Sequence, residues 1–352
     1  VINNLRLGAA LTGEMELDPP IKSLFVFCTN PVSQAPETNK IVAGLKREDL
    51  FTVVSEHFMT DTAKYADIVL PAAMAGEAED MMWSWGHLYL TYNQKAVDPP
   101  GECKPTSDMW RLLAAEMGFD DPVFQMTDSE LAAAYINWDD PKMGGIDMEY
   151  MKTHGYYKLD VGSADTRTPH REGNFPTPSG KVEFLLHDAK NFVAGPFRAM
   201  YEGEQDGTPV DPLPGYVPPR ETPETNPEQA KLYSLNIISP KSHGFLNSCY
   251  ANEPHKIKGQ GEQFVMISPH DAATRSIREG DPVRVYNGRG DFEGVARVTD
   301  DVNPGIVVAT LGYWRSLNRS DGSVNSISSQ EWGGLGRCPS FSDNLVEVMR
   351  VN

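Results

Sequence analysis

The chain has 352 residues, of which 40% are hydrophobic and 23% charged, a balance typical of a folded globular protein. Its 49 acidic residues outnumber its 31 basic residues and give a formal net charge of −18. Such a charge repels phosphate backbones and anionic lipids, which excludes nucleic acid and membrane surfaces as main partners. An anionic ligand must therefore be bound by local donors. No apolar run reaches the roughly 20 residues that span a bilayer.

The four cysteines are far apart in the sequence, and none forms a C-x-x-C pair. This spacing excludes a zinc knuckle or a ferredoxin-type cluster within the chain. We expect reduced, mostly buried thiols and a cytoplasmic location. Because the chain opens on Val1 and not on a methionine, the lack of a leader does not decide the compartment. The cysteines are Cys28, Cys103, Cys249 and Cys338.

The first third of the chain predicts alternating strands and helices. Strands are expected at 23–28, 51–55 and 67–71, with helices at 36–46 and 61–65. This order and the apolar, non-alternating strands predict a doubly wound, mostly parallel sheet covered on both faces. Ligands bind beyond the carboxyl ends of the strands in such sheets, where Asn30 and the Ser55–Glu56 pair lie.

The middle of the chain predicts two helices and then a connector. One helix is expected at 107–117, and Thr127 and Glu130 form a capping box for the next. Eight prolines between Pro196 and Pro227 indicate an extended connector. We therefore expect an α/β domain at 1–195, a connector at 196–231 and a β-domain at 232–352.

The last third has the pattern of a small closed barrel. Six strands are expected, with the tight turn 287–290 joining two of them. The strands are placed at 232–239, 263–267, 282–286, 292–298, 305–310 and 345–351. The predicted architecture is thus a doubly wound α/β domain followed by a six-stranded β-barrel.

Several segments resemble a known family when they are taken in order. The segments are 58–63, 66–71, 98–102 (Asp-Pro-Pro-Gly-Glu) and 177–184 (Thr-Pro-Ser-Gly-Lys-Val-Glu-Phe). Their order is similar to the third domain of the dimethyl-sulfoxide-reductase family of molybdopterin enzymes. The region from 268–294 through Asn325 to 344–348 resembles that family's fourth domain, a double-psi barrel. The resemblance covers nearly the whole chain.

The resemblance implies the carboxy-terminal, cofactor-binding half of a molybdenum or tungsten oxidoreductase that transfers oxygen atoms or hydride and electrons. The implied cofactor is a pair of pterin (molybdopterin) guanine dinucleotides. The metal ligand and an iron–sulfur motif belong to the amino-terminal half, so this chain is expected to be inactive alone. The implied partners are that half, an iron–sulfur electron-transfer subunit and a small-molecule substrate.

Candidate cofactor contacts follow from strand ends and from the resemblance. Each also has a simpler interpretation: an Asx turn at Asn30, a solvated strand end at Glu56, a helix-start acid at Asp108, or a surface loop at 239–248. The candidates are Thr29, Asn30, Ser55, Glu56, Asp108, Ser239, Lys241, Ser242, His243, Gly244, Asn247, Ser248, Asn325 and Asp343.

Some residues depart from the family or favour packing. Ala78 stands where relatives often have a lysine, which puts one cofactor contact in doubt. The aromatic patch of Trp83, Trp85 and 89–92 could line a substrate funnel, but packing is the favoured interpretation. There is no G-x-G-x-x-G or P-loop motif for phosphate.

Two other functions remain open at this stage. The first is a metal-free scaffold, as in the large iron–sulfur subunit of respiratory complex I, and the retained polar residues argue against it. The second is a protein-docking barrel, which the upstream α/β domain disfavours. The substrate is not determined by the sequence.

Overall fold

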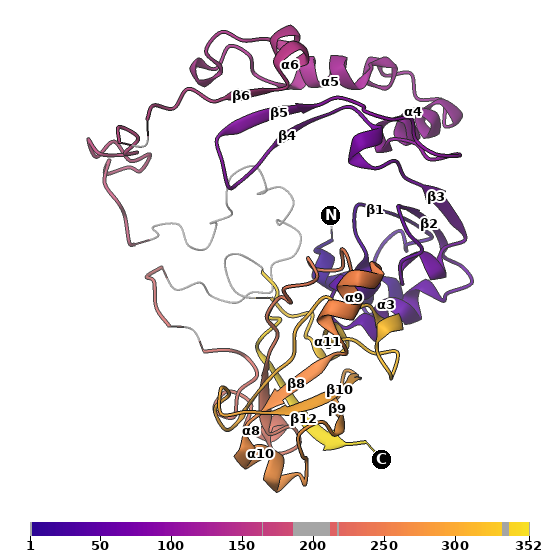
Figure 1. The fold of residues 1–352 in the computed structure, drawn as a ribbon, viewed down its shortest axis with the longest axis vertical. Coiled ribbons are helices and arrows are strands. Elements are labelled where there is room, and N and C mark those ends of the chain that lie inside the picture. The colour runs from indigo at the N-terminus through magenta and orange to yellow at the C-terminus, as the bar shows by residue number, and fades with distance from the viewer. Residues whose placement is uncertain (1, 164, 186–211, 217, 333–337, 352) are drawn as a thin grey trace. The chain divides into compact units, whose positions relative to one another are not determined.

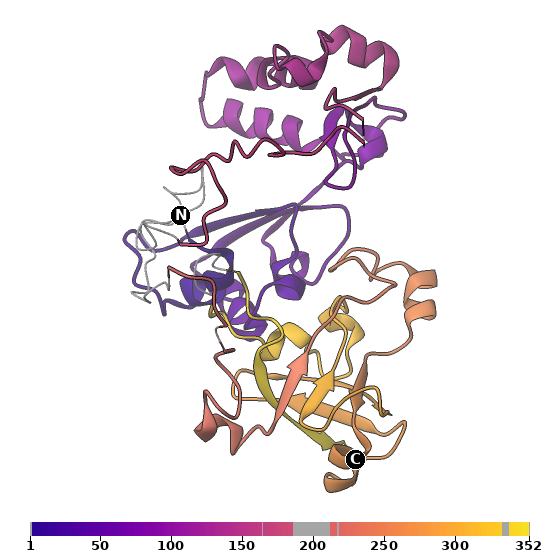
Figure 2. The same ribbon diagram turned by 90° about the vertical axis from the view of Figure 1, so that its left-hand side faces the viewer.

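The computed structural model describes residues 2–163, 165–185, 212–216, 218–332 and 338–351. The chain divides into two compact units. Figures 1 and 2 show the ribbon coloured by residue number, from indigo at the amino terminus to yellow at the carboxyl terminus. The first unit comprises Val1–Val54, Met59–Ile68 and Phe184–Asn352, and the second comprises Ser55–Phe58 and Val69–Glu183.

A three-stranded parallel sheet forms near the amino terminus. Its strands are β1 (Ser23–Phe27), β2 (Phe51–Glu56) and β3 (Ile68–Pro71), in that order. The helical elements around it are η1 (Asn4–Arg6), α1 (Leu7–Thr12), α2 (Pro31–Gln34), α3 (Thr38–Leu45) and η2 (Ala63–Tyr65). Helices α1 and α3 pack so closely that a Cβ at Gly44 would lie within 3 Å of the Leu11 side chain. The predicted parallel sheet is confirmed.

Six strands of the first unit close into a barrel, in the order β10-β8-β11-β7-β12-β9. They are β7 (Leu235–Ile238), β8 (Phe264–Ile267), β9 (Pro282–Tyr286), β10 (Asp291–Val298), β11 (Ile306–Val308) and β12 (Asn344–Arg350). Every second residue of β10, from Phe292 to Ala296, is buried, as expected for a strand with one face in a core. The predicted six-stranded barrel is therefore confirmed.

Short helices and a proline-rich segment accompany the barrel. The helical elements are α8 (Pro227–Ala230), α9 (Pro254–Gln260), α10 (Pro269–Thr274), η7 (Arg315–Leu317) and α11 (Val324–Ile327). Much of the expected connector, 196–211, lies outside the described residues, whereas 218–231 is described and includes α8. Within the described ranges, the helices are all too short or too polar to cross a bilayer.

The second unit contains an antiparallel sheet that was not predicted from the sequence. Its strands are β4 (Asp80–Trp83), β5 (Tyr89–Asn93) and β6 (Tyr156–Lys158), and the order is β4-β5-β6. Its helical elements are η3 (Ala75–Glu77), α4 (Thr106–Glu116), η4 (Pro122–Gln125), α5 (Asp128–Tyr135), η5 (Pro141–Met143) and α6 (Met148–His154). Leu90 and Tyr92 of β5 form a hydrophobic cluster with Met143 of η5 and Met151 of α6.

Two expectations about burial are wrong. Trp83 is 78% exposed and Trp85 is 100% exposed, so the tryptophans of the aromatic patch do not pack. They lie at the end of β4 and in the turn that follows, at the tip of the β4–β5 hairpin. The cysteines are free thiols as expected, but Cys28, Cys249 and Cys338 are exposed and Cys103 is half-buried.

Candidate functional site

Asn30, at the end of β1, is buried and bonded to a distant part of the chain. Its Oδ1 accepts hydrogen bonds from the Thr62 hydroxyl at 2.6 Å and from the Thr62 amide at 3.3 Å. Its Nδ2 donates to the Ser33 hydroxyl at 3.2 Å. Asn30 precedes α2, but its side chain does not cap that helix, so the Asx-turn interpretation is wrong. The side chain instead fixes the loop after β1 to the loop after β2.

Gln34 joins this loop to the polar loop of the barrel. Its Oε1 accepts from the Thr29 hydroxyl at 3.0 Å and from the Asn30 amide at 3.2 Å. Its Nε2 donates to the Ser248 hydroxyl at 3.0 Å, although the two residues are 214 positions apart. Three predicted contacts, Thr29, Asn30 and Ser248, therefore meet at a residue that the sequence did not single out. No local pattern marks Gln34, because its partners are brought together only by the fold.

Aromatic residues stabilise the loop 239–250 that follows β7. Phe245 is buried and packs edge-on against Tyr313, with ring centres 5.1 Å apart. The Trp314 indole donates to the Ser248 carbonyl at 2.7 Å. The Gly244 amide donates to Gln260 at 3.0 Å, and a Cβ at Gly244 would lie 2.6 Å from the same oxygen. These contacts fix the shape of the loop.

The other predicted residues of this loop differ in exposure. Lys241, His243 and Asn247 are exposed, whereas Ser239, Ser242 and Ser248 are buried. The Ser242 hydroxyl accepts from the Phe245 amide at 3.2 Å, so it stabilises the turn. Exposed cationic and amide side chains on a fixed backbone can donate hydrogen bonds to an anionic ligand.

Asn325 and Asp343 reach the same part of the first unit through their neighbours. Asn325 is 9% exposed, and its Nδ2 donates to the Ser33 carbonyl at 2.8 Å. Asp343 is half-buried and follows Ser342, whose hydroxyl accepts from the Ser239 amide at 3.3 Å. The end of β1, the loop after β7 and the start of α11 are thus linked within one unit.

The second unit contains a cavity of about 560 Å³, whose lining includes sequence neighbours of Ser55, Glu56 and Asp108 but not these residues themselves. Its lining includes His57, which follows Ser55 and Glu56, and Ser107, which precedes Asp108. The remaining lining combines apolar side chains, among them Met74, Leu131 and Ile136, with three carboxylates, Glu79, Asp80 and Asp128. Ala78, where relatives often have a lysine, also lines the cavity.

Polar side chains around this cavity are partly engaged with one another. Arg111 donates to Asp108 and to Asp128, each at 2.7 Å, so Asp108 is ion-paired within α4. His57 Nε2 lies 2.9 Å from the Ala73 carbonyl. Close by in the sheet, the Tyr92 hydroxyl donates to Glu79 at 2.6 Å. Burial, followed by this hydrogen bond and the charge of Glu79, raises the pKa of Tyr92 to about 12.

Among the described residues, no group of three or more His, Cys, Asp or Glu side chains is close enough to hold a metal ion. The described groups are suited instead to binding an extended polar ligand through amides, hydroxyls and a lysine. These residue types recur at nucleotide phosphate and ribose sites.

Comparisons with known proteins agree with this arrangement. A family model described as molybdopterin oxidoreductase matches residues 5–116, and one described as molydopterin dinucleotide binding domain matches residues 235–345. The "Probable oxidoreductase YoaE" of Bacillus subtilis is 36% identical over 99% of this chain and 47% of its own length. The "Dimethyl sulfoxide reductase DmsA" of Escherichia coli is 29% identical over 98% of this chain and 44% of its own length.

A solved structure shows the same fold. Acetylene hydratase from Pelobacter acetylenicus matches with a TM-score of 0.74 and 21% identity, covering 100% of this chain and 47% of that one. The chain spans about half the length of the curated relatives it matches. It belongs to the molybdopterin oxidoreductase family, in the group that includes the dimethyl sulfoxide reductases, and it carries that family's dinucleotide-binding domain.

Proposed function

We propose that this chain binds and orients the pair of pterin guanine dinucleotides of a molybdenum or tungsten oxidoreductase. It acts as the cofactor-binding half of an enzyme that transfers oxygen atoms or hydride and electrons, and it is inactive without the other half. The observation that carries the proposal is the link made by Gln34. It holds Thr29 and Asn30 of the α/β part against Ser248 of the barrel loop.

The residues present fit such a ligand. Lys241 and His243 are exposed on the loop after β7, directly before Gly244, and such a loop suits close approach by a phosphate or a flat ring. In the second unit, a cavity of about 560 Å³ with apolar walls and a few polar groups has the size and character of a small-ligand site. We assign this cavity to a guanosine moiety, on the ground that His57 and Ser107, the sequence neighbours of Glu56 and Asp108, line it.

When bound, the cofactor supplies the dithiolene sulfurs that hold the metal at which redox chemistry takes place. This chain contributes binding and orientation. Buried hydrogen bonds at Asn30 and Asn325 keep the two loops in place before the ligand arrives, and Lys241 contributes positive charge in a chain that is otherwise acidic. Ala78 supplies no charge to the second-unit cavity, so the guanosine there depends on the other lining groups.

The proposed partners are the half that completes the enzyme, an iron–sulfur electron-transfer subunit and a small-molecule substrate. The half that completes the enzyme supplies the metal ligand and the iron–sulfur motif. We propose a cytoplasmic location for the assembly. We also propose the domain limits 1–195, 196–231 and 232–352.

The test is the cofactor content of the assembled enzyme. The chain is produced together with the polypeptide that completes it, and molybdenum, tungsten and acid-released GMP are measured. We expect one of the two metals together with GMP. Lys241→Met should lower GMP and metal about tenfold, because a charge-assisted hydrogen bond contributes about 1.5–3 kcal/mol and 1.4 kcal/mol is a factor of ten.

Lys231→Met is the matched control, since Lys231 is exposed and pairs with Glu228 on the short helix α8. It should leave the GMP content unchanged. A purified assembly with neither metal nor GMP would contradict the proposal and favour a metal-free scaffold.

A further inference from the structure

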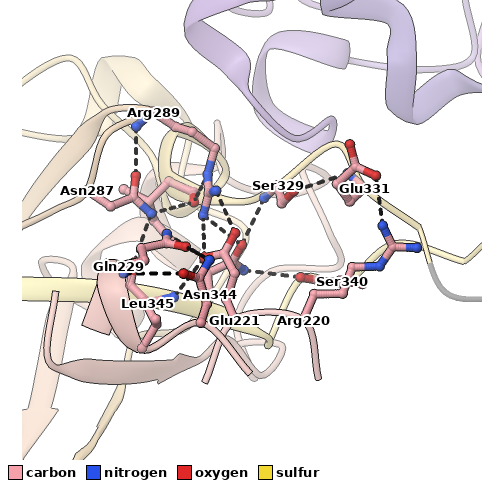
Figure 3. Close-up of polar contacts among 12 residues, drawn as sticks. Arg220, Glu221, Gln229, Asn287, Arg289, Ser329, Glu331, Ser340, Asn344 and Leu345 are labelled. Carbon is pink, nitrogen blue, oxygen red and sulfur yellow. Dashed lines mark hydrogen bonds and ion pairs between the residues drawn. The ribbon is translucent and has the colours of Figure 1, made fainter. Parts of the chain in front are cut away.

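A buried ion pair connects the proline-rich segment to the barrel. Glu221 is 9% exposed, and its Oε1 and Oε2 accept from the two terminal nitrogens of Arg289 at 2.7 and 3.0 Å (Figure 3). Oε2 also accepts from the Leu345 amide at 3.0 Å and from Gln229 at 3.1 Å. The carboxylate is thus fully provided with donors, which is the condition under which a buried charge is tolerated.

Arg289 reaches beyond this carboxylate to the end of α11. It lies in the turn between β9 and β10, and its Nε donates to the Ile327 carbonyl at 2.8 Å. Its Nη2 donates to Asn344 Oδ1 at 3.1 Å, and the same oxygen accepts from the Ser329 amide at 2.9 Å (Figure 3). All three guanidinium nitrogens are therefore used, and the residues after α11 are fixed by the same network.

A second side chain from the same turn, that of Asn287, also donates a hydrogen bond to the end of α11. Asn287 Nδ2 donates to the Ile327 carbonyl at 2.9 Å and to the Leu345 carbonyl at 3.1 Å. The turn lies so close to α11 that a Cβ at Gly290 would be 2.9 Å from the Ser326 carbonyl oxygen. The last turn of α11 thus has little freedom to move.

Helix α11 has four residues, and Asn325 is one of them. At its start, Asn325 bonds to the Ser33 carbonyl beside the Gln34 link. Its last residue, Ile327, is fully buried and bonded to Arg289 and Asn287. In so short a helix, a shift at Ile327 must move Asn325 as well.

We propose that Arg289, held by Glu221, is a positioning residue for Asn325 and so couples the 218–231 segment to the cofactor site. The proposal rests on the function proposed above, in that Asn325 contacts the dinucleotide. Arginine is required here because it donates along two directions at once, toward the Glu221 carboxylate and toward the Ile327 carbonyl. A lysine ammonium can neutralise Glu221 but lacks this planar fork.

The first experiment measures hydrogen exchange of the backbone amides at 327–329 in the complete 352-residue chain. Arg289→Met should speed exchange there at least about tenfold, with exchange in β8 unchanged. Arg289→Lys should give nearly the same acceleration, whereas a purely electrostatic role would be rescued by lysine. Arg284→Met is the matched control, because Arg284 pairs with Asp291 within the same hairpin at 2.7 Å. It should leave exchange at 327–329 at the wild-type rate.

If Arg289→Met does not fold because it leaves Glu221 buried without its cation, the double variant Glu221→Gln/Arg289→Met takes its place. It removes both charges and still lacks the bond to Ile327. Wild-type exchange at 327–329 in this variant, or full protection in Arg289→Lys, overturns the proposal.

The second experiment measures GMP content in the assembled enzyme. Arg289→Met and Asn325→Ala should each lower the GMP content. The GMP content of the combined variant Arg289→Met/Asn325→Ala should be no lower than that of Asn325→Ala alone, because Arg289 acts through Asn325. Independent, additive losses overturn the coupling. A wild-type enzyme that contains no GMP contradicts the proposed function. The exchange experiment still tests separately whether Arg289 positions α11.

Discussion

The two units hold their candidate residues in different ways. In the first unit, candidates such as Asn30 and Asn325 are buried and bonded to their neighbours, at 2% and 9% exposed. In the second unit, Ser55 is buried as well, whereas the Asp108 side chain is 49% exposed and pairs with Arg111. A bonded site loses little freedom when its ligand arrives, whereas an open one must order its side chains at that moment. We therefore expect Asn30 and Asn325 to keep their positions when a ligand binds, whereas the exposed Asp108 side chain would become more ordered on binding.

The largest expected effect is that of a substitution in the barrel core, which tests whether this core stabilises the first unit. Phe292 is fully buried among the apolar residues of that core. Phe292→Ala should lower the free energy of unfolding by about 3–5 kcal/mol, because the removed ring leaves a cavity. Urea unfolding measures the change. Trp85→Ala, at a fully exposed residue of the second unit, serves as control and should change stability by less than about 0.5 kcal/mol. Equal losses in the free energy of unfolding for the two variants would contradict the expectation that the order of the first unit depends on its barrel core.

A smaller effect should come from the Gln34 link. Gln34→Met keeps the length of the side chain but removes its hydrogen bonds to Thr29, Asn30 and Ser248. At about 0.5–1.5 kcal/mol for each of these three bonds, we expect a loss of about 1.5–4.5 kcal/mol in urea unfolding and faster exchange in the 246–250 loop. Gln34→Glu is the matched control, since its carboxylate can accept from all three partners. If the methionine variant is as stable and as protected as wild type, the two loops are not held together by Gln34.

The smallest effect concerns the second unit at high pH. The fold raises the pKa of Tyr92 from 10.0 to about 12, through burial first and then its bond to Glu79. The neutral phenol is the form that the fold favours, so this stabilisation is complete below pH 10 and is lost as pH rises through 12. Ultraviolet titration of tyrosinate, as a difference between wild type and Tyr92→Phe, should show a group that ionises near pH 12.

A companion variant separates the two causes of that shift. Glu79→Gln removes the charge but leaves Tyr92 buried, so its pKa should fall only part of the way back toward 10. Ionisation of Tyr92 near pH 10 in the wild type would contradict the prediction, because it would show that Tyr92 is neither shielded from water nor bonded to Glu79.

Local patterns predicted the barrel well because its strands carry their own signals. Phe292 to Ala296 alternate between buried and half-buried positions, and the turn at 287–290 contains two glycines and an asparagine. The helix α5 was predicted from its capping box, which the structure confirms at Thr127 and Glu130. In each case the deciding interactions are within a few residues of one another.

The parts that were not predicted depend on contacts between distant residues. Gln34 and Arg289 look like ordinary polar residues of a helix and a turn until the fold brings Ser248 and Glu221 to them. The β4–β5–β6 sheet was missed because β6, only three residues long, pairs with β5 from more than 60 positions away. Burial of Trp83 and Trp85 was wrongly expected, because composition does not show that these two residues lie at the exposed tip of the β4–β5 hairpin.

That hairpin tip also gives the molecule an optical property. Trp83 and Trp85 are open to water, Trp110 and Trp138 are half-buried, and Trp314 and Trp332 are 7% and 5% exposed, so the indoles form an exposed, a half-buried and a buried class. A neutral quencher such as acrylamide reaches the exposed class first, and it avoids the repulsion that iodide would meet at a net charge of −18. The red edge of the fluorescence therefore reports the hairpin tip, and it shifts to shorter wavelength whenever another surface covers those two rings.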